Sequence, residues 1–140
     1  MEVQKQDKLH FRGVHIKSVH YDSFEAFVFQ EGIKMSVDAK LKYSRISEDE
    51  FSILMKITLS AEKYFLLELE GEGLFEVKMA QDDKEKRQAF INNNAPAIMF
   101  PYMRAFISSF TANCGGGLIP TLTIPPQFLS GNLEIVESEK

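Results

Sequence analysis

The stretch NAPAIMFPYMRAFISSF, residues 94–110, decides the fold that this sequence predicts. Pro96 suits the first turn of a helix, where its missing N–H leaves no hydrogen bond unmade. Asn93 or Asn94 can cap that helix through a side-chain oxygen. Pro101 lies inside the run, where it removes one backbone hydrogen bond and is expected to kink the helix. Residues 94–110 therefore predict one long, kinked, apolar helix.

Apolar residues fall on several sides of this predicted helix, and a helix with that pattern is normally buried on more than one side. Two interpretations are open. In the first, the helix is the centre of a single core. In the second, a sheet covers one side and a second subunit covers the other. The residues expected at that oligomer interface are Met99, Met103, Phe106 and Phe110.

Composition indicates a single domain over residues 1–140, with 44% apolar residues and a net charge of −4. A negative chain without a clustered basic face is not expected to bind nucleic acid. No apolar run approaches the roughly 20 residues that span a bilayer, so direct membrane insertion is not expected. The N-terminus has no apolar signal core, and the single cysteine, Cys114, fits a reducing compartment. We therefore expect a cytoplasmic protein with disordered ends at residues 1–7 and 135–140.

Three segments before the helix alternate apolar and polar residues with the period of a half-buried strand: residues 35–43, 51–61 and 65–79. Their short connections favour antiparallel pairing. Residues 9–21 have the same character, but their apolar parity slips at Gly13 and Ser18, which predicts a bulged or broken strand. The pattern indicates an α+β domain whose sheet has one covered face and one face in water. One sheet and one helix leave apolar surface to bury, which points to oligomerisation.

The segments between these elements leave more than one interpretation. Asp82 or Asp83 can cap a short helix that runs to about Asn92, ahead of the main helix. Residues 22–32 read either as a strand that continues into a turn or as an apolar connection that lines a groove. The glycine run at 115–117 lacks the Lys-Ser/Thr pair of a phosphate loop, so no nucleotide cofactor is expected.

Glu68, Glu70 and Glu72 lie at alternate positions on the polar side of the last period-two segment. They fit a solvated face, a docking site for a basic partner, or an acid/base pair or cation site of a small ligand-binding or catalytic domain. The last interpretation lacks a nearby nucleophile in the sequence. The three histidines stand five residues apart, which puts successive side chains on opposite faces of a strand and makes a metal site unexpected.

The stretch from Asn94 to Leu133 resembles the SecB family of protein-export chaperones. The matching residues of the helix and the segment after it are Pro96, Phe100, Pro101, Tyr102, Arg104, Gly117, Pro120, Leu122, Pro125 or Pro126, Phe128 and Leu133. Residues 14–17, 23–26 and 73–75 are similar to strand segments of the same family. The resemblance covers most of the chain, from about Leu9 to Leu133.

This resemblance implies a four-stranded antiparallel sheet with one long helix on one face, assembled as a homotetramer that is a dimer of dimers. It implies an ATP-independent holdase that binds unfolded preproteins and delivers them to the SecA motor, with no cofactor and no enzymatic activity. The family pattern places client-binding grooves at Phe27, Phe29, Ile124, Phe128 and Leu129. It places the contact with SecA or another partner at Glu25, Leu66 and Glu68.

Two departures from the family pattern bear on the expected partner. Tyr21 stands where the family has an acidic residue, although Asp22 follows it. The chain also stops soon after Leu133, where a typical member continues into a second helix and a polar tail, and this shortened C-terminus affects the helix-dependent part of SecA binding. A branch of the family acts on antitoxins. A chaperone dedicated to an antitoxin or another specific partner is therefore the alternative to a general export chaperone.

Overall fold

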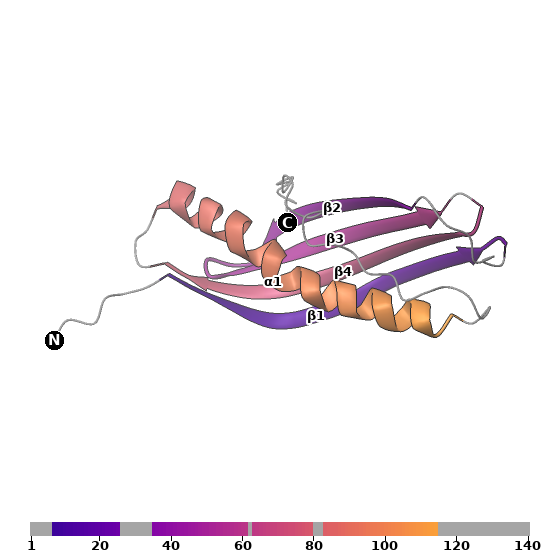
Figure 1. Cartoon of the computed structure of the whole chain (residues 1–140). Coiled ribbons are helices and arrows are strands. Elements are labelled where there is room, and N and C mark those ends of the chain that lie inside the picture. Colours follow the sequence, from indigo (N-terminus) through magenta and orange to yellow (C-terminus); the bar gives the residue numbers. More distant parts are fainter. Residues whose placement is uncertain (1–6, 26–34, 62, 80–82, 115–140) are drawn as a thin grey trace.

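One antiparallel sheet with a single helix across one of its faces forms the fold (Figure 1). The computed structural model describes residues 7–25, 35–61, 63–79 and 83–114. Its elements are β1 (Lys8–Ser23), β2 (Ser36–Arg45), β3 (Glu50–Ala61), β4 (Phe65–Lys78) and α1 (Lys84–Ala112). The four strands run in the order β1-β4-β3-β2, and each neighbouring pair is antiparallel. The predicted α+β class with a four-stranded sheet and one long helix is confirmed.

The alternating pattern of the sequence becomes the two faces of this sheet. On β3 and β4, every second side chain is buried on the face toward α1, and the residues between them point to the open face. Phe51 stacks on Phe75 across this pair of strands with ring centroids 5.1 Å apart. The largest fully buried side chains are Phe51, Phe65, Phe75, Ile53, Met55, Ile57, Leu59, Leu67, Leu69, Ile91, Met99 and Met103.

Strand β1 is bulged at both positions where its apolar parity slips. Its pairing with β4 shifts register between Phe11 and Val14 and again between Ile16 and Ser18. Gly13 sits in the first bulge with φ of 110°, a conformation that favours glycine because other residues carry a Cβ. The bulges keep apolar residues of β1 on the face toward α1 although the parity of the sequence changes. The prediction of a bulged strand is confirmed.

Helix α1 is one element of 29 residues, so the prediction of a short helix followed by a separate main helix is wrong. Asp83 caps its start, since Oδ1 accepts from the backbone N–H of Glu85 at 3.0 Å and of Lys86 at 3.3 Å. Asn94 is not a cap: its side-chain Nδ2 donates to the carbonyl oxygen of Phe90 at 2.7 Å, inside the helix. Asn93 also lies within α1, and Pro96 lies in the middle of the helix rather than in its first turn.

The helix continues through both prolines because burial holds it on each side of them. Ile91 and Ala95 precede Pro96 in the buried stripe, and Met99 and Met103 follow it. This burial offsets the backbone hydrogen bonds that Pro96 and Pro101 cannot make. The helix changes direction in its middle part, which holds the two prolines (Figure 1). In the described ranges, no helix is long and apolar enough to cross a membrane.

Two glycines of β4 let the helix approach the sheet. A Cβ atom at Gly73 would lie 2.9 Å from the sulfur of Met99. A Cβ atom at Gly71 would collide with the sulfur of Met103 and would lie 3.2 Å from a methyl group of Val14. Both methionine side chains are fully buried. The absence of side chains at these two positions therefore creates the space in which the centre of α1 packs on β4.

Candidate functional site

The residues predicted to form the client-binding grooves, Phe27, Phe29, Ile124, Phe128 and Leu129, lie outside the described residues. The structure does describe the start of the first of these segments. Phe24 follows the end of β1, and its backbone N–H donates to the carbonyl oxygen of Tyr64 at 2.8 Å. Its side chain is 59% exposed, which is unusual for a phenylalanine next to a sheet. The connection after β1 thus begins with an apolar side chain in water.

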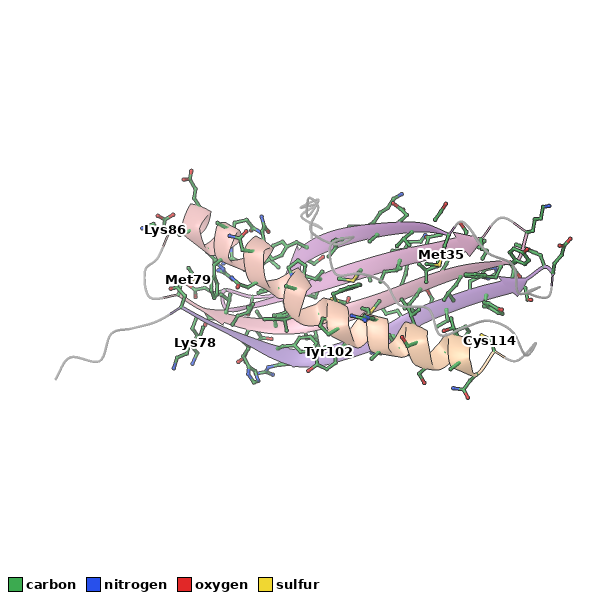
Figure 2. All side chains as sticks on the ribbon, viewed as in Figure 1. Met35, Lys78, Met79, Lys86, Tyr102 and Cys114 are labelled. Atoms are coloured by element: carbon green, nitrogen blue, oxygen red, sulfur yellow. The ribbon has the colours of Figure 1, made fainter. Side chains whose placement is uncertain are left out.

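A second apolar area forms where α1 runs beside β1, and we call it the helix–β1 surface: Phe11, Val19, Tyr21, Tyr102, Phe106 and Phe110. Phe11 and Tyr102 have ring centroids 4.8 Å apart, and Tyr21 meets Phe110 edge-on at 5.7 Å. Phe106 stacks on Phe110 at 6.0 Å. Tyr102 is 55% exposed, and it lies on the stretch of α1 beside β1, with Cys114 beyond the end of that helix (Figure 2).

The interface predicted from the sequence divides into two pairs of residues in the structure. Phe106 and Phe110 belong to the helix–β1 surface and are partly exposed, so both can contact a second subunit. Met99 and Met103 are fully buried against β4 of their own chain and leave no surface for a partner. Tyr102 was missed as an interface candidate. Its signal was present in the sequence, because Tyr102 shares an apolar stripe with Phe106 at i, i+4 spacing.

The predicted docking residues gather at one end of the open face of the sheet. Leu66 and Glu68 lie two positions apart on β4, and their register partners on β1 are Asp22 and His20. His20 Nε2 and Asp22 Oδ2 are 2.7 Å apart. Glu25 is exposed and lies just beyond the end of β1. Asp22 therefore lies beside Leu66 and near Glu68 on this face, a position that the register of β1 on β4 shows.

Basic residues lie beside the carboxylates further along the open face. Lys17 Nζ lies 3.9 Å from Glu72 Oε2, and Lys56 of β3 is the register partner of Glu70. Among the residues that the structure describes, no group of three or more His, Cys, Asp or Glu side chains could hold a metal ion. Within these residues, the ligand-binding or catalytic interpretation of Glu68, Glu70 and Glu72 therefore finds no set of metal ligands to support it.

Cys114 lies against Tyr21 at the end of the helix–β1 surface. Burial raises the pKa of the Cys114 thiol, and a hydrogen bond with Tyr21 lowers it in part. The thiol also donates to the carbonyl oxygen of Phe110, with the sulfur 3.2 Å away. Burial raises the pKa of the Tyr21 hydroxyl as well. A thiol in this setting stays protonated and is a poor nucleophile, as expected for an inert cysteine.

Comparisons with known proteins agree with this fold. A family model described as "Preprotein translocase subunit SecB" matches residues 2–127. The chain is 32% identical to the uncharacterized protein MJ0357 of Methanocaldococcus jannaschii over 100% of this chain and 92% of that protein. It is 24% identical to the protein-export protein SecB of Alcanivorax borkumensis, over 90% of this chain and 83% of that protein.

A solved structure has the same fold. It is the SecB-like chaperone Rv1957 of Mycobacterium tuberculosis in complex with a ChAD peptide from the antitoxin HigA1. The TM-score is 0.64 at 12% identity, and the match covers 84% of this chain and 86% of that one. The sheet order, the single long helix and the family match over residues 2–127 lead to one conclusion. This chain belongs to the SecB family.

Proposed function

We propose that this protein is an ATP-independent holdase that binds unfolded preproteins in the cytoplasm and delivers them to the SecA motor. Membership of the SecB family supports a chaperone rather than an enzyme. The observation that carries the proposal is the exposed Phe24 at the start of the apolar connection that follows β1. Phe27 and Phe29 follow Phe24 in the sequence and extend the same apolar run.

The proposed capture of clients by this connection depends on the burial of apolar surface. Burial of one client leucine or phenylalanine side chain contributes roughly 1.5–3 kcal/mol, so several weak contacts can hold a chain without reading its sequence. Ile124, Phe128 and Leu129 would add further apolar contacts from the C-terminal segment. A polypeptide held by such contacts stays extended and can be released without ATP.

The helix–β1 surface supports assembly of the proposed tetramer. Its aromatic side chains line one side of α1, and Tyr102 and Val19 remain 55% and 37% exposed in the single chain. Exposed aromatic surface beside a sheet edge is typical of an interface between subunits. We propose that Phe106 and Phe110 meet their equivalents in a second subunit, and that pairs of such dimers form the tetramer.

The docking of SecA is proposed for the end of the open face that carries Leu66 and Glu68. Asp22 strengthens this proposal, because it lies beside Leu66 on the neighbouring strand. Glu25 extends the acidic character beyond the end of β1. An apolar side chain within a group of carboxylates suits a partner surface that combines a small apolar contact with basic residues.

A chaperone dedicated to an antitoxin is the second candidate function. The observation that favours it is the fold shared with Rv1957, whose solved complex contains a peptide from the antitoxin HigA1. The two functions would use the same apolar contacts but different clients. A dedicated chaperone binds one sequence far more tightly than others, whereas a general holdase binds many chains with similar affinity.

Suppression of aggregation tests the proposed function. The full chain, without nucleotide, would be titrated against a chemically unfolded, export-type protein while light scattering is recorded. We expect suppression near one tetramer per client. The variant Phe24→Ser combined with Phe27→Ser and Phe29→Ser is expected to weaken the effect about tenfold or more. Ile46→Ser is the matched control, since Ile46 is 55% exposed but lies in the turn between β2 and β3.

The outcome separates the two candidate functions. Full suppression of several unrelated clients supports the general holdase. Suppression confined to one antitoxin-like client supports the dedicated chaperone. If neither the parent chain nor any variant suppresses aggregation at any ratio, the proposal of a holdase is wrong. If Ile46→Ser weakens the effect as much as the phenylalanine variant, the assignment of the groove is wrong.

A further inference from the structure

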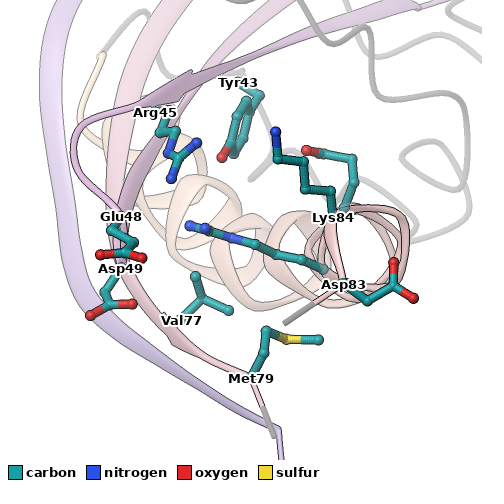
Figure 3. A pocket seen from close by; sticks show the side chains of 10 residues that line it. Tyr43, Arg45, Glu48, Asp49, Val77, Met79, Asp83 and Lys84 are labelled. Atoms are coloured by element: carbon teal, nitrogen blue, oxygen red, sulfur yellow. The ribbon is translucent and has the colours of Figure 1, made fainter. Parts of the chain in front are cut away.

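A cavity of about 490 Å³ lies at the opposite end of α1 from the helix–β1 surface (Figure 3). It is enclosed by the end of β2, the turn that joins β2 to β3, the end of β4 and the first two turns of α1. Its lining residues are Tyr43, Arg45, Glu48, Asp49, Val77, Met79, Asp83, Lys84, Arg87 and Gln88. The volume is in the range of cavities that hold small molecules.

The walls of this cavity are held by backbone hydrogen bonds and by the helix cap. The N–H of Val77 donates to the carbonyl oxygen of Asp49 at 2.8 Å, which ties the β2–β3 turn to β4. Arg45 Nε donates to the carbonyl oxygen of Ser47 at 3.2 Å. The carboxylate of Asp83 accepts from two backbone N–H groups of α1 and is therefore occupied as the helix cap. The cavity is thus a formed part of the fold.

Arg87 brings two unpaired hydrogen-bond donors to the wall of this cavity. Its Nε and Nη2 atoms are buried and have no hydrogen-bond partner in the described chain. These two nitrogens carry the parallel N–H groups of one guanidinium edge, which is the edge that binds a carboxylate with two hydrogen bonds. Buried charged donors almost always have a partner in folded proteins, so two unpaired donors on one edge indicate an acceptor that the described residues do not provide.

The charges around Arg87 show what kind of acceptor fits. Arg45 and Lys84 add positive charge to the lining, and no ion pair joins either of them to an acid in the described residues. Glu48 and Asp49 lie on the wall across from Lys84 (Figure 3). These two carboxylates repel a dianion more strongly than a monoanion. The cavity therefore favours a carboxylate over a phosphate.

The remaining lining residues indicate the body of the ligand. The side chains of Val77 and Met79 are apolar, and Tyr43 contributes an aromatic ring. Such surfaces bind a short aliphatic or aromatic group next to the charged end of a molecule. We infer that this cavity is a binding site for a small monocarboxylate whose carboxylate pairs with Arg87 and whose apolar body lies against Tyr43, Val77 and Met79. This site is separate from client capture and goes beyond the proposed function.

Binding requires a movement of the Arg87 side chain. The Nε–Nη2 edge is shielded in the described chain. The long Arg87 side chain would therefore have to turn to present this edge to a ligand in the cavity. Because the lining comes from β2, β4 and α1, a bound ligand would connect the start of the helix to the sheet. A ligand that binds only the folded form raises the melting temperature, and the increase grows with the logarithm of the ligand concentration once this exceeds Kd.

Sodium benzoate is the probe for the test, with the full chain labelled with ¹⁵N-arginine. Benzoate is expected to shift the Nε–H signal of Arg87 in a saturable way and to raise Tm. Acetate, which has the carboxylate without the ring, is expected to bind more weakly. Inorganic phosphate and benzyl alcohol are expected to produce no saturable shift. Tighter binding of phosphate than of benzoate would overturn the assignment of a carboxylate ligand.

Two variants locate the binding. Arg87→Leu is expected to reduce benzoate affinity about tenfold or more, because it removes both donors of the paired edge. Arg104→Leu, on the same helix but outside the cavity, is the matched control and is expected to bind as the parent does. Glu48→Gln removes a repelling carboxylate and is expected to raise affinity about two- to threefold, which gives a readout if Arg87→Leu fails to fold. Equal shifts of all arginine signals, or unchanged binding by both cavity variants, would overturn the inference.

Discussion

At the scale of single residues, a buried donor without an acceptor lowers the stability of the fold and can therefore mark a binding site. Arg87 has two buried donors without acceptors in the described chain. None of the three basic residues that line its cavity forms an ion pair with a described residue. A residue that only stabilised the fold would not be kept in this state. Cys114 is the opposite case, since its thiol has partners in Tyr21 and in the carbonyl oxygen of Phe110.

The stability of an Arg87→Met variant checks the unpaired guanidinium without any ligand. Methionine keeps the apolar part of the side chain and removes the two unpaired donors. We expect the free energy of unfolding in urea to rise by about 1–3 kcal/mol. Arg104→Met is the matched control, and its effect should stay within about 0.5 kcal/mol. A loss of stability in Arg87→Met would show that the guanidinium has a partner in the folded protein.

The reactivity of Cys114 checks the environment at the end of the helix–β1 surface. Because burial raises the pKa of this thiol in the folded state, less thiolate forms at pH 8 than in the unfolded chain. Iodoacetamide should therefore react several-fold faster in urea than in buffer. Unfolding favours deprotonation of this group, so its contribution to stability is present below about pH 8.5 and is lost as the pH rises. Equal alkylation rates in the two states would contradict this description.

At the scale of elements, the packing of α1 on β4 depends on two positions of the strand that carry no side chain. Gly71 and Gly73 leave the space that Met103 and Met99 fill, and this close approach allows a helix with two prolines to stay attached along its length. The contact is local in space but distant in sequence. The helix therefore depends on the sheet for its continuity more than on its own residues.

Gly71→Ala tests this close approach. The added methyl group meets the sulfur of Met103 and a methyl group of Val14, so we expect a loss of about 1–3 kcal/mol in the free energy of unfolding. Met103→Ala leaves a cavity and also destabilises, but the two changes together should cost less than their sum. Urea unfolding of the two single variants and the double variant measures this coupling. Additive effects would mean that the two side chains do not meet.

The elements differ in how far local patterns could predict them. The bulges of β1 were predictable because the slip of parity at Gly13 is a local signal, and a sheet with one covered face leaves one way to accommodate it. The joining of two expected helices into α1 was not, since Pro96 and the preceding asparagines are local signals for a helix start. Burial of Ile91 and Ala95 against the sheet overrides them, and that burial depends on tertiary packing.

The same limit applies to the candidate sites. The apolar pattern of residues 94–110 showed that the helix is buried on several sides but not which side meets the sheet. Met99 and Met103 were therefore assigned to an interface although they belong to the core. Leu66 and Glu68 could be placed together because alternate residues of a strand share a face. The cavity around Arg87 could not be predicted, since its walls come from the ends of three elements and one turn.

At the scale of the whole molecule, the position of each helix residue decides how a charge affects assembly. Phe106→Glu is expected to split the proposed tetramer and to leave the circular dichroism of the chain unchanged, because Phe106 is partly exposed on the helix–β1 surface. Met103→Glu is expected to unfold the chain itself, because it buries an unpaired charge in the core. Native mass and circular dichroism together separate the two results.

The control for this experiment is Ala89→Glu, which adds the same charge to an exposed position of α1 outside the helix–β1 surface. It should keep both the native mass and the fold. If Phe106→Glu retains the mass of the parent protein, the helix–β1 surface is not the interface. If Met103→Glu remains folded and monomeric, Met103 is accessible to a partner after all.

The bulged edge of β1 has a consequence for the proposed binding of unfolded chains. In the described part of the sheet, β1 has β4 as its one neighbour, so its outer edge exposes free backbone groups. A straight edge of this length would be a template on which one extended chain after another could add without limit. The interruptions at Gly13 and between Ile16 and Ser18 divide that edge into short runs. We expect this division to keep β1 from seeding a fibre of the client chains that the proposed function brings to the protein.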